Sequence, residues 1–277
     1  MKICTAQMAS EWENPGANLE KAAHFAGAAR AEGADLICFP EQFVTGWSPH
    51  SARLAEGPDG RTVRSLRDLA RDHSIYVVGS CIQKHDPNPL NTSIAIDPRG
   101  EVVASFSKIH PFSPGGEDLH YDPGDHLSVF VAGDVQFGIA ICYDLRFAPL
   151  FRAYALGGVH AVLVPSAWPC SRIHAWDTLI QARALDNQFY VIGCNPTGTT
   201  PVDRYCGHSL SADPRGRVIA KGGEGEEMVF TDVNPAVVET TRARMPVERD
   251  IRPELYHRLL RDAGTDSSDL HPGTQNG

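Results

Sequence analysis

The stretch VQFGIAICYDLRF, residues 135–147, decides the fold prediction, because an apolar run leads into a helical pattern. The run over residues 135–141 predicts a buried strand, and residues 145–156 have helical spacing. Cys142 therefore lies where a strand is followed by a helix. The amides and positive dipole of a helix start stabilise a thiolate, so we expect the pKa of Cys142 to be lowered. The alternative is a buried structural cysteine that ends a core strand.

Short apolar runs alternate with helical patterns on both sides of this stretch. That alternation, together with paired hairpins, predicts an α/β fold whose sheets are not purely parallel. The expected strands are residues 2–8, 35–39, 75–82, 91–96, 102–106, 135–141, 161–164, 189–194, 207–212, 218–220 and 227–232. The expected helices are residues 18–31, 62–72, 145–156 and 175–187.

The tetrapeptide Asp-Pro-Arg-Gly occurs twice, at residues 97–100 and 213–216, each time between two expected strands. This repetition leads to the hypothesis of a duplicated half, in which the second half of the chain repeats the structure of the first. Because no linker-like segment separates the halves, we expect a single domain over residues 1–261. We expect the polar tail, residues 262–277, to be poorly ordered or to be used in a subunit contact.

Composition excludes several classes of protein. The 277 residues include 25 Lys and Arg against 34 Asp and Glu, a net charge of −9, which disfavours binding to nucleic acid or an anionic membrane. The chain shows neither an apolar run of membrane-spanning length nor a signal-peptide pattern, so we expect a cytoplasmic protein. Its seven cysteines form no CxxC pair and no nucleotide-binding motif is present, so we expect no metal and no cofactor. Asn91-Thr92-Ser93 matches a glycosylation sequon, which we interpret as a chance match.

Three chemically useful residues follow expected apolar strands. Glu41 follows residues 34–40, Lys108 follows residues 102–107, and Cys142 ends the stretch described first. Strand ends open onto the ligand crevice of α/β sheets, so these side chains are expected to meet. Taken singly, Glu41 is explained as an exposed loop carboxylate and Lys108 as a solvated charge. Together they supply a base, an oxyanion partner and a nucleophile.

With these residues, the sequence resembles the nitrilase superfamily, the carbon–nitrogen hydrolases, from residue 2 to about residue 256. The matching motifs are FPE at 39–41, SKIH at 107–110, GIAICYDLRF at 138–147, VPSAW at 164–168 and QARALDN at 181–187. The resemblance implies a four-layer α-β-β-α sandwich with mixed sheets. It also implies a homodimer or higher homo-oligomer.

The resemblance also implies roles for individual residues. Glu41 would be the general base, Lys108 the oxyanion partner and Cys142 the nucleophile that forms a thioester and releases ammonia. The second glutamate of the family falls on Glu117, for which a solvated turn residue is the alternative. The backbone N–H of Tyr143 would complete the oxyanion hole.

The region after residue 164 carries the substrate prediction. Trp168-Pro169, with Arg172 and Trp176, resembles the omega-amidase branch, which cleaves the terminal amide of short 2-oxo dicarboxylic acid monoamides. Arg172 is expected to clamp the substrate carboxylate. Trp168 is expected to form an apolar wall; the alternatives are a core tryptophan and a surface arginine.

Other functions remain open on the sequence. They are an N-carbamoyl amine or amino-acid hydrolase, a nitrilase, and a catalytically quiet scaffold that binds a small molecule. Asp144 and Arg146 lie two residues apart beside the nucleophile, and we interpret them as an orienting structural pair.

Overall fold

The computed structural model describes residues 1–265, and the part of the expected tail that covers residues 266–277 lies outside the described residues. The chain forms two compact units, Met1–Thr241 and the residues from Arg242 onward. The larger unit contains two six-stranded sheets within the described part of the chain. No helix described is long and apolar enough to span a lipid bilayer.

The two sheets have mixed strand directions. The first has the order β14 (Glu227–Asp232), β1 (Lys2–Gln7), β2 (Leu36–Cys38), β3 (Tyr76–Gln83), β4 (Leu90–Ile96) and β5 (Val102–Ser107). The second has the order β13 (Val218–Lys221), β12 (Leu210–Ala212), β9 (Tyr190–Cys194), β8 (Ala161–Pro165), β7 (Val135–Ile139) and β6 (Val129–Ala132). A separate hairpin joins β10 (Thr197–Thr199) to β11 (Arg204–Cys206).

The two sheets repeat one topology, as the hypothesis of a duplicated half predicts. Strands β1, β2 and β3 are parallel and are followed by antiparallel β4 and β5; β7, β8 and β9 are followed in the same way by β12 and β13. Each half places its last strand in the other sheet, since β6 pairs with β7 and β14 pairs with β1. The two Asp-Pro-Arg-Gly turns join equivalent strands. In both, the aspartate carboxylate accepts the backbone N–H groups two and four residues later.

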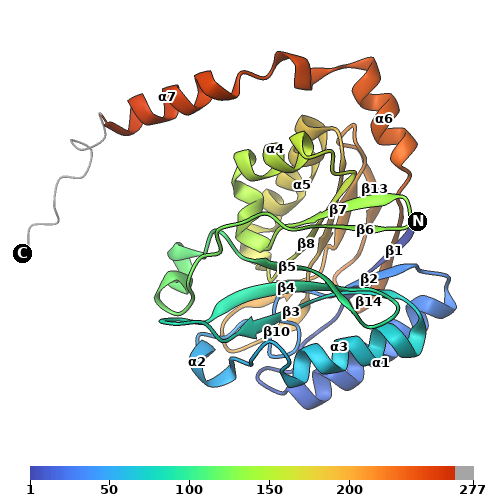
Figure 1. Cartoon of the computed structure of the whole chain (residues 1–277). Coiled ribbons are helices and arrows are strands. Elements are labelled where there is room, and N and C mark those ends of the chain that lie inside the picture. Colours follow the sequence, from blue (N-terminus) through green and yellow to red (C-terminus); the bar gives the residue numbers. More distant parts are fainter. Residues whose placement is uncertain (266–277) are drawn as a thin grey trace, which may run out of the picture. The chain divides into compact units, whose positions relative to one another are not determined.

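Helices cover the outer faces of this sandwich (Figure 1). Helices α1 (Pro15–Ala31) and α3 (Arg61–His73) pack on the first sheet, and α4 (Ala148–Leu156) and α5 (Ile173–Asn187) on the second. Along β1, Ile3 belongs to the core between the sheets and Cys4 to the core under α1 and α3, as the two-residue period of a strand requires. The expected α-β-β-α layering with mixed sheets is confirmed.

One expected helix begins later than its periodicity suggests. Residues Cys142–Arg146 form a 3₁₀ turn, η3, and the α-helix starts only at Ala148. Pro149 lies in its first turn, where the missing N–H has no cost. The Asp144 carboxylate accepts the Ile141 N–H at 3.0 Å and closes the tight turn that precedes it.

Several elements, most of them short, carry no clear sequence signal. They are α2 (Ser51–Leu54), η1 (Ser113–Gly115), η2 (Glu117–Leu119), β6, η4 (Cys170–Arg172), β10, β11, α6 (Pro235–Arg244), η5 (Val247–Asp250) and α7 (Pro253–Thr265). Residues 262–265 of the expected tail belong to α7.

Candidate active site

A cavity of about 290 Å³ opens where strands of the two sheets end. Glu41 lies three residues beyond β2 of the first sheet, and Cys142 lies three residues beyond β7 of the second. Lys108 directly follows β5, and Glu117 begins η2. All four side chains are at least 90% buried and line the same cavity. The structure therefore brings together the four residues that the resemblance singled out.

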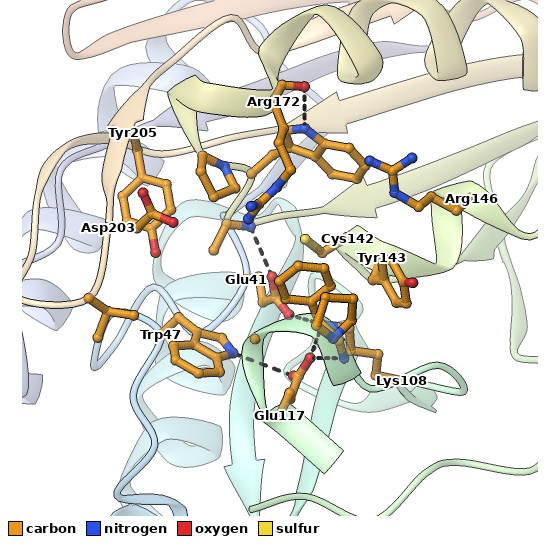
Figure 2. Close-up of a pocket in the computed structure, with 17 residues that line it drawn as sticks. Glu41, Trp47, Lys108, Glu117, Cys142, Tyr143, Arg146, Arg172, Asp203 and Tyr205 are labelled. Carbon is orange, nitrogen blue, oxygen red and sulfur yellow. Dashed lines mark hydrogen bonds and ion pairs between the residues drawn. The ribbon is translucent and has the colours of Figure 1, made fainter. Parts of the chain in front are cut away.

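Lys108 lies between the two glutamates (Figure 2). Its Nζ is 2.8 Å from Glu41 Oε1 and 2.6 Å from Glu117 Oε2. The Asn91 amide donates to both carboxylates as well, at 2.7 Å to Glu41 and 3.0 Å to Glu117. Glu117 is thus buried together with Glu41 and Lys108. The alternative that Glu117 is a solvated turn residue is wrong.

Further backbone donors orient each carboxylate. The Ala167 N–H donates to Glu41 Oε2 at 2.9 Å, and the Phe112 N–H donates to Glu117 Oε2 at 2.6 Å. The Trp47 indole N–H is 3.4 Å from Glu117 Oε1. Because each carboxylate is held from several directions, neither can rotate freely.

The two glutamates titrate differently. Burial raises the pKa of Glu41, and the negative charge of Glu117 adds to this, so Lys108 only partly compensates. Burial also disfavours charge on Glu117, but Lys108 and the surrounding donors lower its pKa below the ordinary value. Neighbouring carboxyl groups with opposite shifts are typical of an acid–base pair with divided tasks. Glu117 is therefore the stable anion, and Glu41 is the group able to take up a proton.

Lys108 remains charged in this setting. Burial alone would lower the pKa of its ammonium group, but Glu117 and Glu41 outweigh burial and hold the pKa well above its ordinary value. The site thus presents a fixed cation next to the sulfur of Cys142. Such a cation is suited to stabilising a negative oxygen that develops near it.

The expected lowering of the Cys142 pKa is wrong. Burial and the Glu41 carboxylate raise the pKa of the thiol well above its ordinary value, against the opposing effect of Lys108. The thiol lies within hydrogen-bonding reach of Glu41, so a base is available to remove its proton. The short η3 turn does not supply the dipole of a long α-helix. Cys142 also has a φ of +46°, a left-handed conformation that non-glycine residues rarely adopt and that is often found at functional sites.

The remaining expected site residues line the outer part of the cavity. Tyr143 lies beside Cys142, with its ring centroid 4.9 Å from that of Phe112. Trp168 is 3% exposed and belongs to the core, and it also lines the cavity, so the prediction of an apolar wall for the substrate stays a prediction. Arg172 lines the cavity with its guanidinium 4.9 Å above the Phe112 ring, and it also stands partly exposed at the start of α5.

The expected Asp144–Arg146 pair is not formed. The Asp144 carboxylate instead contacts His110 Nδ1 at 2.7 Å and accepts the His110 N–H at 3.0 Å. Arg146 lines the cavity with its guanidinium 5.2 Å from the Trp168 ring centroid. Side chains two residues apart do not face each other on a helical turn, so Asp144 and Arg146 contact different partners. Figure 2 shows Cys142 between the glutamate–lysine group and the two arginines.

Sequence reasoning missed several residues of this site, among them Asn91, Trp47, Asp203 and Tyr205. Asn91 had a signal, since a polar side chain in a buried strand calls for a partner. Trp47 and Asp203 lie on loops and Tyr205 on the short strand β11, all distant in sequence from the other site residues, and nothing local marks them. Among residues 1–265, no cluster of three or more His, Cys, Asp or Glu side chains is arranged to hold a metal ion.

The carbon–nitrogen hydrolase family matches residues 2–243, and the chain belongs to this family. It is 32% identical to the 2-oxoglutaramate amidase of Bacillus subtilis over 256 residues, covering 92% of this chain and 98% of that protein. It is also 32% identical to the omega-amidase NIT3 of Saccharomyces cerevisiae, covering 92% of this chain and 94% of that protein.

Solved structures agree with this assignment. The crystal structure of Saccharomyces cerevisiae Nit3, from the nitrilase superfamily, superposes with a TM-score of 0.82 at 31% identity, covering 89% of this chain and 94% of that one. A mutant amidase from Nesterenkonia sp. AN1, with acrylamide added to its active-site cysteine, has a TM-score of 0.80 at 28% identity over 90% of this chain and 99% of that one. The chain is an amidase-type carbon–nitrogen hydrolase.

Proposed function

We propose that this enzyme is an omega-amidase that hydrolyses the terminal amide of a short 2-oxo dicarboxylic acid monoamide. The observation that carries the proposal is one small cavity holding a Glu–Lys–Cys group on one side and two arginines on the other. The names of the relatives, 2-oxoglutaramate amidase and omega-amidase, support it.

The first step is attack on the amide carbon. Glu41 accepts the thiol proton while Cys142 Sγ forms a bond to the carbonyl carbon, so the raised pKa of the thiol is overcome by a base in contact with it. The negative oxygen of the tetrahedral intermediate is stabilised by Lys108 Nζ and the Tyr143 N–H. In comparable sites one oxyanion donor contributes about 3–4 kcal/mol.

The intermediate then collapses. Glu41 returns its proton to the leaving nitrogen, the C–N bond breaks, and ammonia departs from a thioester on Cys142. Glu41 next removes a proton from water, whose oxygen bonds to the thioester carbon. The C–S bond then breaks, the acid is released, and Glu41 returns the proton to the Cys142 sulfur. Glu117 keeps its charge throughout and holds Lys108 in place, which its lowered pKa supports.

Substrate selection depends on the arginines. Among the described residues, neither Arg146 nor Arg172 forms an ion pair with a protein carboxylate, and each guanidinium lies over an aromatic ring that keeps it in place. A planar guanidinium binds a carboxylate with two parallel hydrogen bonds. We propose Arg172 as the carboxylate clamp, with Arg146 beside it and Trp168 as the apolar wall for the substrate carbon chain.

Ammonia release from a panel of amides tests this function. We expect turnover of 2-oxoglutaramate to exceed that of glutamine, of a simple nitrile and of a neutral amide of the same length. Faster turnover of N-carbamoyl-β-alanine would replace the proposal with an N-carbamoyl amino-acid hydrolase, because both arginines would bind its carboxylate equally well. No turnover of any member of the panel would favour a quiet binding scaffold.

We also propose the assembly, location and extent of the functional protein. A homodimer or higher homo-oligomer is supported by exposed Leu156 and Leu185 on α4 and α5. A cytoplasmic location is supported by the absence of any disulfide among the seven cysteines, all of which lie within the described residues.

One domain over residues 1–261 is proposed to carry the activity. Light scattering of the purified chain and turnover after truncation at residue 261 test the first and third proposals.

A further inference from the structure

Asn91 is the second residue of β4, and its side chain is enclosed within the protein. Only 1% of the residue is exposed, so the Asn91-Thr92-Ser93 sequon is unsuited to carrying a glycan. A buried primary amide needs partners for two N–H groups and one oxygen, since an unsatisfied polar atom in the interior is costly. The partners of Asn91 are therefore informative about what the residue does.

The amide of Asn91 joins the two catalytic-site carboxylates. Its Nδ2 donates to Glu41 Oε1 at 2.7 Å and to Glu117 Oε1 at 3.0 Å. Its Oδ1 is 3.4 Å from the Ser80 hydroxyl, which in turn accepts the Gln42 N–H at 3.0 Å. This arrangement defines the orientation of the amide, because a flipped amide would direct oxygen at two carboxylates.

The backbone of Asn91 also positions the lysine. The Lys108 N–H donates to the Asn91 carbonyl at 2.8 Å and extends the pairing of β4 with β5 by one residue. One residue therefore contacts both glutamates through its side chain and anchors Lys108 through its main chain. A substitution at this position changes the side-chain contacts and leaves the main-chain contact in place.

We infer that Asn91 is a positioning residue that keeps Glu41 deprotonated and aimed at Cys142. Two carboxylates that share one lysine repel each other, and a neutral donor to both lowers that cost without adding charge. An alkyl side chain would supply no donor, and an acid would add a third negative charge. The inference rests on the proposed role of Glu41 as the base.

The direction of the effect follows from the groups around Glu41. Its charged and titratable neighbours across the cavity and behind it are Lys108, Glu117, Cys142, Tyr121 and Tyr205. Loss of the Asn91 donor destabilises the ionised form of Glu41, so its pKa rises further above the ordinary value. Glu41 and Cys142 are in contact and titrate as a pair, so the pH midpoint for thiol reactivity moves upward with it.

The test measures alkylation of Cys142 by iodoacetamide as a function of pH, followed by mass spectrometry of the peptide that contains Cys142. Asn91→Ala is compared with the control variant Thr92→Val. In the unchanged protein the Thr92 hydroxyl contacts Ser107 Oγ at 3.0 Å and neither glutamate. We expect the midpoint to move up by about one pH unit in Asn91→Ala, the size of one lost charge-assisted hydrogen bond, and to stay in place in Thr92→Val. A lower maximal rate with an unchanged midpoint in Asn91→Ala, or equal shifts in both variants, would overturn the inference.

Ser80→Ala decides the question if Asn91→Ala does not fold. This change removes the hydroxyl that orients the Asn91 amide, so a smaller upward shift is expected, and an unmoved midpoint overturns the inference. Alkylation needs no substrate. The acid limb of amide hydrolysis should shift by the same amount, and absence of any turnover with the alkylation shift intact would refute the proposed function alone.

Discussion

Lys108 lies closer to Glu117 than to Glu41, with Nζ–Oε distances of 2.6 and 2.8 Å, and the pKa values of the two carboxyl groups shift in opposite directions. We propose that the closer pair stays ionised throughout the reaction and that Glu41 is the carboxylate that exchanges a proton. Similar residues thus acquire different tasks from their surroundings.

Replacing each glutamate by glutamine should separate these tasks. Glu41→Gln removes the base, so we expect a loss of about 10³-fold or more in kcat, whereas Glu117→Gln leaves the base and displaces the lysine, for a loss of about 10–100-fold. Steady-state ammonia release measures both. Mass spectrometry should still detect a thioester in Glu117→Gln. Equal losses in the two variants would contradict the division of roles.

Cys142→Ala should lower turnover by about 10⁴-fold or more, because no other group in the cavity can form the thioester. Cys170→Ser serves as the matched control, since Cys170 lies between the cavity residues Pro169 and Arg172 but does not itself line the cavity. We expect the control to retain activity. Full turnover by Cys142→Ala would refute the nucleophile assignment.

Arg172→Ala should raise KM for carboxylated amides by about 10–100-fold and leave neutral amides unaffected, because the lost hydrogen bonds involve only the carboxylate. Arg146→Ala should have the same selectivity with a smaller effect. Arg204→Ala is the control, since that exposed arginine faces Glu224 at 4.0 Å. If KM rises equally for charged and neutral substrates, neither arginine is the clamp.

Glu13 should stabilise the loop that carries Trp47. Burial disfavours its charge, but hydrogen bonds from Ser48, His50 and Arg53 outweigh burial and lower the pKa of Glu13 to about 2. Because the pKa of Glu13 is lower in the folded protein than its unfolded value of 4.5, the ionised carboxylate stabilises the folded state above pH 4.5. This stabilisation is lost as the pH falls from 4.5 towards 2. Glu13→Gln should therefore cost about 1–2 kcal/mol of unfolding free energy at pH 7.

Urea denaturation at several pH values measures this effect. The difference between wild type and Glu13→Gln should shrink as the pH falls and disappear near pH 2. Glu20→Gln, on the exposed face of α1, is the control and should show no difference at any pH. A Glu13→Gln cost that does not change with pH would show that the carboxylate charge is not responsible.

The site residues that could be predicted from the sequence come just after apolar strands in the chain. Glu41, Lys108 and Cys142 lie just beyond β2, β5 and β7, and local pattern is enough to locate such strand ends. The chance nature of the sequon at Asn91 agrees with its burial, but its role in the site was missed because its partners lie 50 and 26 residues away in the chain. Arg146 was misassigned because its aromatic partner, Trp168, belongs to a distant segment of the chain.

The amino-acid sequence by itself determined the main strands and helices and the residue types at the strand ends, whereas the repetition of the halves stayed a hypothesis until the strand order was known. These properties depend on neighbours within a few residues, and periodicity records them. The tertiary structure decided that the Cys142 thiol has a raised pKa, that the pKa values of Glu41 and Glu117 shift in opposite directions, and that Arg146 belongs to the cavity. Proton affinity depends on burial and on charges that approach through space, and the chain acquires those surroundings only when its two sheets pack together.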